Sequence, residues 1–534
     1  MPRHLVHLDP LHLPSKAIDV LIVGGGVAGL SAALSAADAG RDVLVVLKGA
    51  RGESATAWAQ GGMAAAVHAE DSVALHGEDT ARVGAGLSHP DVVQLVVEEA
   101  PALVERWCEW DARFDRDAGG AFSLALEGGH SSPRVLHAHG DQTGREIQRL
   151  LGVRASADDR ITVHEDTFVL DLVTDSGRVT GALAWSRRAG YHVLWAGATI
   201  VTTGGAGQLW RETSNPPSAT GDGLAMAYRA GARLRGLEFV QFHPTVLYVA
   251  GMARILVSEV ARGEGGLLVD RKGHRFMPDY HPDAELAPRD VVSRAIVQQL
   301  SKVRDTQVFL DMRHLEREFL EARFPVITAA CLEFDLDMAE DLIPVHPACH
   351  YLVGGIETDT EGATNLAGLF AAGECASSGL HGANRIASNS LLEGAVLGDR
   401  AGRHAAAEAR KPVPARELEP REAPSLSGHL DVTDLDAALR SLMWRYVGIE
   451  RDGPSLQAAA QRLAGWNDLV GRRVLGDPLG WVLTNKLQLG ALVTAAALER
   501  TESRGTHARR DHPETHDDSW LRDLAWTRPQ GDGA

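Results

Sequence analysis

Three glycines near the amino terminus have the spacing that binds a phosphate-bearing cofactor. Gly24, Gly26 and Gly29 form a G-x-G-x-x-G motif between an apolar run at residues 18–23 and an alanine-rich segment. The first glycine allows a tight turn, the second lets a pyrophosphate approach the backbone, and the third lets helix and strand pack closely. The amino end of the helix, at Val27 and Ala28, then faces the anion with free N–H groups. Because strand, glycines and helix occur in the required order, they favour dinucleotide binding over a glycine-rich turn without a ligand.

A second stretch, at residues 368–398, has a related design. A short strand at 369–372 ends in Gly373-Glu374, and a glycine-rich loop leads to Ser388-Asn389-Ser390, which we expect to cap a helix beginning near Leu391. A second helix amino terminus is thus aimed at the same region. A ligand held by two segments so far apart in the chain must be large, and FAD fits this requirement better than NAD.

The segments between these two stretches supply further candidate cofactor contacts. Residues 42–47 are predicted to form a second parallel strand, which ends in Lys48 rather than the acid that commonly binds ribose, so the ribose contact must differ. Residues 53–67 include many small side chains and Gly61-Gly62, and we expect them to lie against the isoalloxazine. An ordinary Gly/Ala loop has the same composition. Asp222 either caps a helix at 224–230 or touches the cofactor, and capping is the preferred interpretation.

These residues must be positioned by several domains. The chain has 534 residues, too many for one core. We predict an α/β fold, in which a Rossmann-like FAD-binding domain is interrupted by an α+β capping domain and followed by a C-terminal helical bundle. The predicted parts are residues 1–235 (FAD-binding domain, first part), 236–353 (capping domain), 354–410 (FAD-binding domain, second part), 411–428 (linker) and 429–534 (helical domain). The inserted capping domain is well placed to cover the flavin and form the substrate pocket.

Local patterns refine this organisation. One or two helices are expected at 88–113, an antiparallel unit at 162–201 and one clear helix within the capping domain at 290–303. Three helices are expected at 434–448, 453–469 and 478–503, and a polar, frayed tail after Pro513. The glycine-rich loop at 126–144 carries Glu127, His130, Arg134 and His137. Such a loop is more often a surface turn than a site.

Composition excludes several classes of function. The net charge of -18 argues against nucleic acid or an anionic membrane as a partner. No apolar run has transmembrane length, and the amino end has no apolar signal core. The four cysteines are scattered without a C-x-x-C pair, which indicates a reducing cytoplasm and no zinc or iron–sulfur site.

Several separate motifs together resemble one family. They are GGGVAGL at 24–30, Ser54-Ala55-Thr56 with AQGG at 59–62, QFHPT at 241–245, RGEGG at 262–266, APRD at 287–290 and HGANRIASNSLLE at 381–393. From about residue 18 to 513, the chain resembles the succinate dehydrogenase/fumarate reductase flavoprotein family. The EGGH sequence at 127–130 and ESRG at 502–505 resemble an aspartate-oxidising branch of that family.

The resemblance implies a flavin enzyme that acts on a four-carbon dicarboxylate. The implied reaction is oxidation of L-aspartate to iminoaspartate, with the flavin reoxidised by oxygen, giving hydrogen peroxide, or by fumarate, giving succinate. Iminoaspartate feeds quinolinate synthase in NAD biosynthesis, which makes that enzyme a candidate partner.

The resemblance also assigns roles to individual residues. His350 and Arg385 would grip one carboxylate, and His243 and Ser258 the other, with Ser258 standing where threonine is expected. Glu127 would supply the counter-charge for the amine. Arg289 is the candidate for proton transfer, although an arginine is normally fully protonated and electrostatic clamping is the safer role. Glu259 and Arg262 would relay protons or pair with each other. The implied cofactor contacts are Gly24, Gly26, Val27, Ala28, Gly29, Lys48, Ser54, Ala55, Thr56, Gln60, Gly61, Gly62, Asp222, Glu374, Ser390 and Leu391.

One departure from the family pattern is informative. Membrane-bound members attach FAD covalently through a histidine in an S-H-T segment, and this chain has Ala55 at that position. Alanine has no nucleophile, so FAD is expected to be non-covalent. The alternative functions are a soluble fumarate reductase or succinate-oxidising flavoprotein and, from another class, a flavin-binding interaction protein without turnover.

Overall fold

The computed structural model describes residues 4–6, 8–249, 255–414 and 430–529. At its centre lies a seven-stranded sheet in the order β6-β2-β1-β9-β8-β7, with β16 also pairing with β9. The pairs of β1 with β2 and β9, of β2 with β6, and of β9 with β16 are parallel, whereas β7, β8 and β9 form an antiparallel meander. The bounds are β1 (Ser15–Val23), β2 (Val43–Val46), β6 (Ile161–His164), β7 (Thr167–Asp175), β8 (Arg178–Ser186), β9 (Gly190–Val201) and β16 (Leu369–Ala371).

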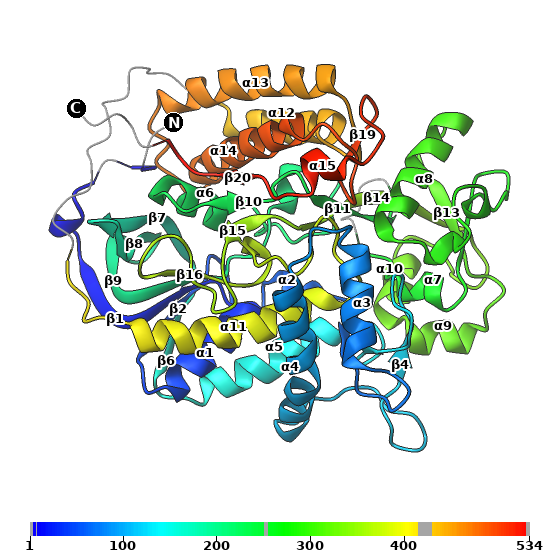
Figure 1. Cartoon of the computed structure of the whole chain (residues 1–534), viewed down its shortest axis with the longest axis horizontal. Coiled ribbons are helices and arrows are strands. Elements are labelled where there is room, and N and C mark those ends of the chain that lie inside the picture. Colours follow the sequence, from blue (N-terminus) through cyan, green and yellow to red (C-terminus); the bar gives the residue numbers. More distant parts are fainter. Residues whose placement is uncertain (1–3, 7, 250–254, 415–429, 530–534) are drawn as a thin grey trace.

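The two faces of this sheet are covered by different helices. Successive side chains of a strand point to opposite faces. Val20 and Ile22 of β1 accordingly pack in one core with α1 (Val27–Asp38), α4 (Pro90–Glu109), α5 (Thr143–Ser156) and α11 (Asn389–Glu408). Leu21 and Val23 pack in another core with α6 (Asp222–Ala230) and the carboxyl-terminal helices. Figure 1 shows α1 and α11 on one side of the molecule and α12 to α14 on the other. Both faces are buried, which explains the continuous apolar run of β1.

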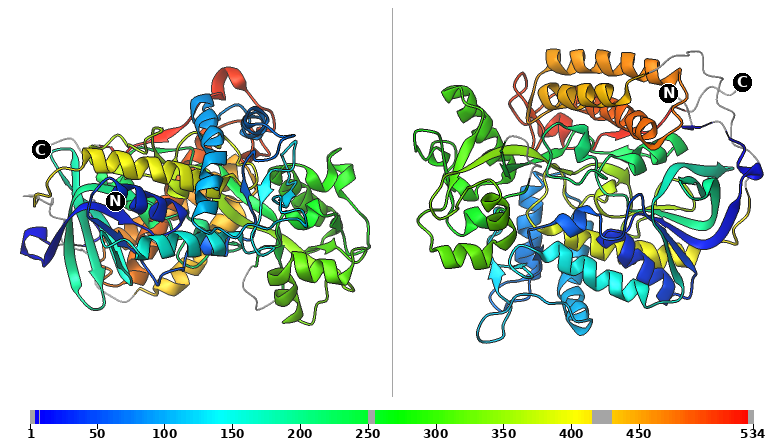
Figure 2. Two further views of the ribbon diagram at one scale, coloured as in Figure 1. Left: turned by 90° about the horizontal axis from the view of Figure 1, so that it is seen from below. Right: turned by 180° about the vertical axis from the view of Figure 1, so that it is seen from behind.

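The predicted capping region contains a separate antiparallel sheet in the order β11-β14-β13-β12. Its strands are β11 (Val240–Leu247), β14 (Ile343–Leu352), β13 (Val308–Asp311) and β12 (Leu267–Val269). The helix expected at 290–303 is present as α8 (Arg289–Val303), but the expectation of one clear helix is wrong, because α7 (Val260–Gly263), α9 (Arg317–Arg323) and α10 (Pro325–Leu332) also form. In both views of Figure 2 this green region lies to one side of the central sheet.

The three helices predicted near the carboxyl terminus are confirmed as α12 (Val432–Tyr446), α13 (Gly453–Gly471) and α14 (Pro478–Glu499). An aspartate side chain accepts a backbone hydrogen bond at each start. The frayed tail predicted after Pro513 is wrong. The segment forms α15 (Asp517–Trp520) and β20 (Ala525–Trp526), and β20 pairs with β10 (Leu234–Arg235). Backbone pairing thus orders a segment whose polar composition suggested a loose end. Residues 415–428 of the predicted linker lie outside the described residues.

Short elements complete the fold. The expected helix at 88–113 is the single helix α4, which follows α3 (Val73–Val83). Other short elements are α2 (Ala55–Trp58), β3 (Met63–Ala64), β4 (Leu124–Ala125), β5 (Val135–Leu136), β15 (Gly355–Glu357), β17 (Ala376–Ser377), β18 (Glu450–Arg451) and β19 (Ala508–Arg509). No helix of the described residues combines the length and apolar character needed to cross a bilayer.

Close contact between α1 and α11 fixes the two helix starts that border the cofactor cleft. A Cβ added to Gly398 would lie 2.5 Å from the Ala28 carbonyl oxygen, and one added to Gly402 would lie 2.3 Å from the Ala32 carbonyl oxygen. Real Cβ atoms do not approach backbone so closely, so the crossing requires glycine at these positions.

We therefore expect Gly398→Ala to lower the midpoint of thermal unfolding. Overpacking at this contact costs about 1–3 kcal/mol, which exceeds the roughly 0.5–1 kcal/mol that alanine gains over glycine in a helix. The matched control is Gly465→Ala in α13, where an added Cβ meets nothing within 4 Å. This variant should be as stable as the wild type or more stable. Equal midpoints for the two variants in circular dichroism melts would contradict the packing argument.

Candidate active site

A cleft with an empty volume of about 1920 Å³ runs from the edge of the central sheet to the sheet of the predicted capping region. Segments that directly follow β1, β2, β9 and β16 line one part of it, namely residues 24–28, 47–50, 202–205 and 372–374. His243 of β11 and His350 of β14 line another part. Ligands of open parallel sheets bind at the carboxyl ends of the strands, and this cleft lies there.

Fifteen of the sixteen candidate cofactor residues line the cleft. The exception is Gly29, where a Cβ would lie 2.1 Å from the Gly24 carbonyl oxygen, so that it serves close packing between turn and helix. The others are Gly24, Gly26, Val27, Ala28, Lys48, Ser54, Ala55, Thr56, Gln60, Gly61, Gly62, Asp222, Glu374, Ser390 and Leu391.

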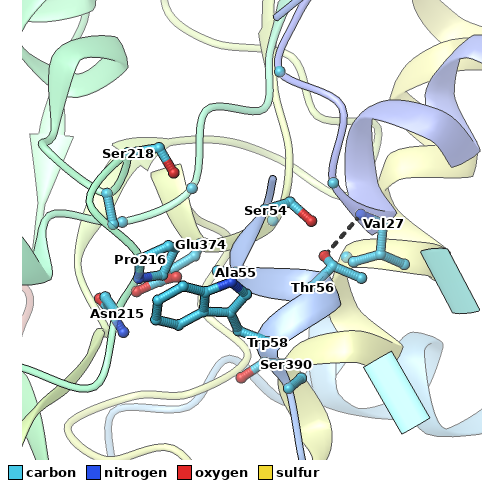
Figure 3. Close-up of a pocket in the computed structure, with 18 of the residues that line it drawn as sticks. Val27, Ser54, Ala55, Thr56, Trp58, Asn215, Pro216, Ser218, Glu374 and Ser390 are labelled. Atoms are coloured by element: carbon cyan, nitrogen blue, oxygen red, sulfur yellow. Dashed lines mark hydrogen bonds between the residues drawn. The ribbon is translucent and has the colours of Figure 1, made fainter. Parts of the chain in front are cut away.

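Two helices begin at the cleft, as an anionic cofactor requires. Val27 at the start of α1 donates its N–H to Thr56 Oγ1 at 3.0 Å, which Figure 3 shows as a dashed line. The helix predicted near Leu391 is α11, which begins two residues earlier at Asn389. The expected cap is wrong, because Ser388 has φ 61° and makes no side-chain capping hydrogen bond. Its hydroxyl instead donates to Glu127 Oε2 at 2.6 Å.

Asp222 is the other capping interpretation that the structure overturns. Gly221 is the N-cap of α6, without a side-chain cap. The Asp222 carboxylate accepts from Lys48 Nζ at 2.8 Å and from Thr220 Oγ1 at 2.6 Å. Burial opposes ionisation, but the Lys48 ammonium outweighs it and holds the pKa of Asp222 below its usual value. The second strand therefore ends in a lysine that is paired with an acid from α6.

The loop at 126–144 was expected at the surface, and that expectation is wrong for its charged residues. Glu127, His130, Arg134 and His137 are all buried. Arg134 forms ion pairs with Asp71 at 2.8 Å and Asp79 at 2.6 Å. Arginine can be buried when its hydrogen bonds are satisfied by carboxylates in this way. The loop thus forms an inner wall behind Gly61 and Gly62.

Four basic side chains converge on the part of the cleft next to the capping sheet. His243, Arg289, His350 and Arg385 line it together with Ser258 and Glu259. The rings of His243 and His350 lie 5.2 Å apart, and Ser214 Oγ lies 2.9 Å from His350 Nδ1. His243 Nε2 is buried and has no hydrogen-bond partner among the described residues. An unpaired buried nitrogen next to two arginines suits the carboxylate of a ligand.

One amide oxygen separates the two guanidinium groups. Gln241 Oε1 accepts from Arg289 Nη1 at 3.2 Å and from Arg385 Nη2 at 3.0 Å. Arg385 also lies 5.1 Å from the centre of the Tyr351 ring. Sequence reasoning missed Gln241, Tyr351 and Ser214. Gln241 lies inside the QFHPT motif, which was its only signal.

The charges of this cluster follow from burial. Desolvation, with repulsion from Arg289, lowers the pKa of His243 and of His350 well below the usual value, so both imidazoles are neutral at pH 7. Burial and Arg289 also lower the pKa of Arg385 to about 9, which leaves it charged. The cluster therefore offers two guanidinium charges and two neutral imidazoles to a ligand.

Arg289, Glu259 and Arg262 form a buried row. Arg289 Nε donates to Glu259 Oε2 at 2.5 Å, and Arg262 Nη2 lies 3.2 Å from Glu259 Oε1. Despite its burial, the two guanidinium groups keep the pKa of Glu259 below its usual value. Arg262 lies behind Glu259 and does not line the cleft. Gly128 makes room for this row, because a Cβ there would lie 2.3 Å from Glu259 Oε1.

Glu127 also stands one layer behind the cleft surface. A Cβ added to Gly61 would lie 3.9 Å from Glu127 Oε1, and Ser388, which bonds Oε2, lines the cleft itself. Burial, reinforced by repulsion from Glu259, raises the pKa of Glu127. This carboxyl is therefore a proton acceptor closer to neutrality than an ordinary glutamate.

Comparisons with known proteins match this architecture. A family model described as an FAD binding domain matches residues 19–391, and one described as the fumarate reductase flavoprotein C-terminus matches residues 480–534. The L-aspartate oxidase of Streptomyces coelicolor is 42% identical over 536 residues, covering 96% of this chain and 92% of that protein. The L-aspartate oxidase of Mycobacterium tuberculosis strain H37Rv is 44% identical over 506 residues, covering 93% of each.

Solved structures agree with the sequence relatives. A mutant of FrdA from E. coli quinol fumarate reductase superimposes with a TM-score of 0.91 at 32% identity, covering 98% of this chain and 96% of that chain. Mycobacterium smegmatis Sdh1 superimposes with a TM-score of 0.83 at 35% identity, covering 98% and 93%.

The cleft, its two helix starts and the family models define an FAD-binding flavoprotein of the fumarate reductase type. The predicted fold class and the predicted cofactor are thereby confirmed. Within this class, the identity to curated relatives over nearly the whole chain shows that the protein belongs to the L-aspartate oxidase family.

Trp58 is a cleft residue that sequence reasoning did not single out. Its side chain is 49% exposed, unusual for an indole, and it lines the cleft. In Figure 3 the indole lies near Pro216, Asn215 and Glu374, in the space that FAD is expected to border.

We expect Trp58→Ala to raise the dissociation constant for FAD about 3- to 10-fold, because aromatic contacts contribute about 0.5–1.5 kcal/mol. The measurement is a titration of the FAD-free protein with FAD, followed by flavin fluorescence. Trp110→Ala is the control, since Trp110 stacks with Arg106 and Arg154 and does not line the cleft. An unchanged constant in Trp58→Ala would show that the indole does not contact FAD.

Proposed function

We propose that the protein oxidises L-aspartate to iminoaspartate, with oxygen or fumarate as the final electron acceptor. The observation that carries the proposal is the pairing of two charge types at one end of the cleft. Two guanidinium groups and two imidazoles match the two carboxylates of a four-carbon acid, and the nearby Glu127 carboxylate matches an amine.

The residues of the cleft divide the work of binding. Arg385 and His350 hold one carboxylate, and His243 and Ser258 hold the other. Glu127 compensates the ammonium group from behind Ser388. These contacts fix the orientation of the substrate, and correct orientation is a large part of the rate enhancement. Bound FAD supplies the hydride acceptor, which no amino-acid side chain provides.

Arg289 lies between the substrate end of the cleft and Glu259. Its guanidinium stabilises the charge of the substrate and exchanges protons with the Glu259–Arg262 row when a proton must reach or leave carbon. Of the two roles, the electrostatic one rests directly on geometry, because Arg289 is charged, buried and hydrogen-bonded to Glu259 and Gln241.

The second candidate function is a soluble fumarate reductase or succinate-oxidising flavoprotein. Two observations favour it. The cation cluster can bind any four-carbon dicarboxylate, and the chain is 32% identical to FrdA. Succinate and fumarate have no amine, so in this function Glu127 would have no group of the substrate to bind. For that reason we rank it second.

We further propose that FAD is held without a covalent bond, because Ala55 lines the cleft with no nucleophile. The reversible FAD titration of the wild type tests this, since covalently attached FAD cannot be removed and added back.

We place the reaction at the first step of NAD biosynthesis in the cytoplasm, where all four cysteines remain free thiols, with quinolinate synthase as a candidate partner. Co-purification of the two enzymes tests that partnership.

The test of the function is anaerobic mixing of the FAD-loaded protein with either L-aspartate or succinate. We expect L-aspartate to bleach the flavin absorbance and succinate to bleach it much more slowly, because only the amino acid satisfies Glu127. Bleaching by succinate alone would establish the second candidate function instead.

We expect Glu127→Gln to slow flavin reduction by L-aspartate roughly a hundredfold, because breaking a buried charge pair costs about 3 kcal/mol. Reoxidation of reduced flavin by fumarate should change much less.

In the wild type, the rate of flavin reduction by L-aspartate should also fall as the pH is lowered through the raised pKa of Glu127, since the protonated carboxyl no longer balances an ammonium. The charged groups that set this pKa are Glu259, Arg289 and Arg385.

The matched control is Arg289→Lys, which keeps the charge but loses the two-pronged geometry. It should impair both half-reactions, measured by stopped-flow absorbance. Equal losses in both half-reactions for Glu127→Gln would remove the case for Glu127 as the partner of the amine.

A further inference from the structure

His137 stands between Glu127 and a second cavity on the far side of the loop wall. Its Nε2 lies 4.0 Å from Glu127 Oε1, and a Cβ added to Gly62 would lie 3.1 Å from its Cε1. His137 thus lies directly behind a glycine that lines the cofactor cleft. It is also one of the residues that line the second cavity.

The second cavity has an empty volume of about 700 Å³ and a charged lining. Its side chains include Asp115, His139, Glu264 and Arg323. His139 is exposed, and Glu264 pairs with Arg323 at 3.1 Å. The cavity therefore borders the buried residue His137 on one side and the exposed residue His139 on another.

The polar atoms along this line lack partners. Glu127 Oε1 and both ring nitrogens of His137 are buried and make no hydrogen bond within the part of the chain that the structure describes. Leaving such groups unpaired in the interior is unfavourable. An unpaired buried carboxylate oxygen that faces an unpaired buried imidazole is typical of a site that binds a water molecule or takes part in catalysis.

Ser388 holds the carboxyl in place. Its hydroxyl donates to Glu127 Oε2, which leaves Oε1 toward Gly61 and His137. The serine has φ 61°, a left-handed conformation that is rare outside glycine and is strained. This conformation directs the hydroxyl to Glu127 instead of to the start of α11.

We propose that Glu127 and His137 form a proton path from the substrate amine to the second cavity, with Ser388 as a positioning residue. The proposal rests on the proposed oxidation of an amino acid. The gap of 4.0 Å is closed by a small side-chain rotation or by one bridging water.

The path has a defined chemical task. The substrate ammonium gives one proton to Glu127, which leaves a neutral amine with a lone pair. Bound FAD would accept the Cα hydrogen with its two electrons as hydride, and the amine lone pair would then form the C=N bond of protonated iminoaspartate. Glu127 passes its proton to one nitrogen of His137, which releases its other N–H proton to water in the cavity.

The ionisation state of His137 fits this role. Burial, with the nearby Arg323 charge, lowers the pKa of His137 to about 3. The ring is therefore neutral at pH 7, with one nitrogen able to accept a proton while the other donates one. The titratable and charged groups that face it are Glu127 from the cleft side and Asp115, His139, Glu264 and Arg323 around the cavity.

Reduction of fumarate places its proton on carbon and has its own route through Arg289, Glu259 and Arg262. The route through Glu127 and His137 and the route through Arg289, Glu259 and Arg262 both start at the bound substrate and involve different residues. A defect in the His137 path should therefore appear in one half-reaction only.

The test compares His137→Asn with the wild type. We expect flavin reduction by L-aspartate to slow at least tenfold, with a larger solvent deuterium isotope effect, whereas reoxidation by fumarate stays within twofold. His139→Asn is the matched control, because His139 lies on the exposed rim of the same cavity, and asparagine tolerates its φ of 51°. That control should behave like the wild type.

A second measurement does not depend on turnover or on a His137 variant. In the resting FAD-loaded protein with ¹⁵N-labelled histidine, Glu127→Gln should shift the His137 ring resonances and leave those of His139 unchanged. Unshifted His137 resonances, or equal slowing of both half-reactions in His137→Asn, would overturn the path. Failure of the function itself looks different, since L-aspartate would then not bleach even the wild-type flavin.

Discussion

The structure depends on burying two arginines side by side. Arg289 and Arg385 share the amide oxygen of Gln241 as an acceptor, and like charges that are buried together repel strongly. Glu259 offsets part of this repulsion from one side, and the Tyr351 ring accepts the face of Arg385 from another. The remaining positive potential suits a ligand that carries two carboxylates. Burial, reinforced by this positive field, lowers the pKa of His243 and of His350 well below the usual value, so both act as neutral hydrogen-bonding groups.

The two arginines come from segments that are far apart in the chain. Arg385 belongs to the loop that leads into α11, whereas Arg289 begins α8, in the predicted capping region. Neither half of the chain has the complete cluster. The cluster is complete because the β11–β14 pair lies against the glycine-rich loop at 373–388, where Gln241 on β11 bonds directly to Asn384 and Arg385.

Sequence reasoning succeeded where local physics decides the structure. The strand–glycine–helix order at 18–38 and the three carboxyl-terminal helices follow from periodicity, capping residues and steric rules that act within a few residues. It failed where a distant partner decides. The loop at 126–144 looks solvent-exposed until Asp71 and Asp79 are seen to neutralise Arg134. Asp222 and Ser388 look like helix caps until Lys48 and Glu127 are seen to take their side chains. The tail beyond Pro513 is ordered by distant partners, because β20 pairs with β10 and Arg500 donates to the backbone oxygens of Trp520 and Arg522.

The charges of the cleft are compatible with the proposed use of both an amino acid and a dicarboxylate. Arg262, Arg289 and Arg385 carry three positive charges, and Glu259 carries one negative charge. When Glu127 is ionised the cluster has a net charge of +1, which balances the single net negative charge of L-aspartate. When Glu127 is protonated the cluster has +2, which balances fumarate or succinate. Burial raises the pKa of Glu127 toward neutrality, so switching between the two states is less costly here than for an ordinary glutamate. The protonation state of Glu127 therefore matters for substrate selection as well as for amine oxidation.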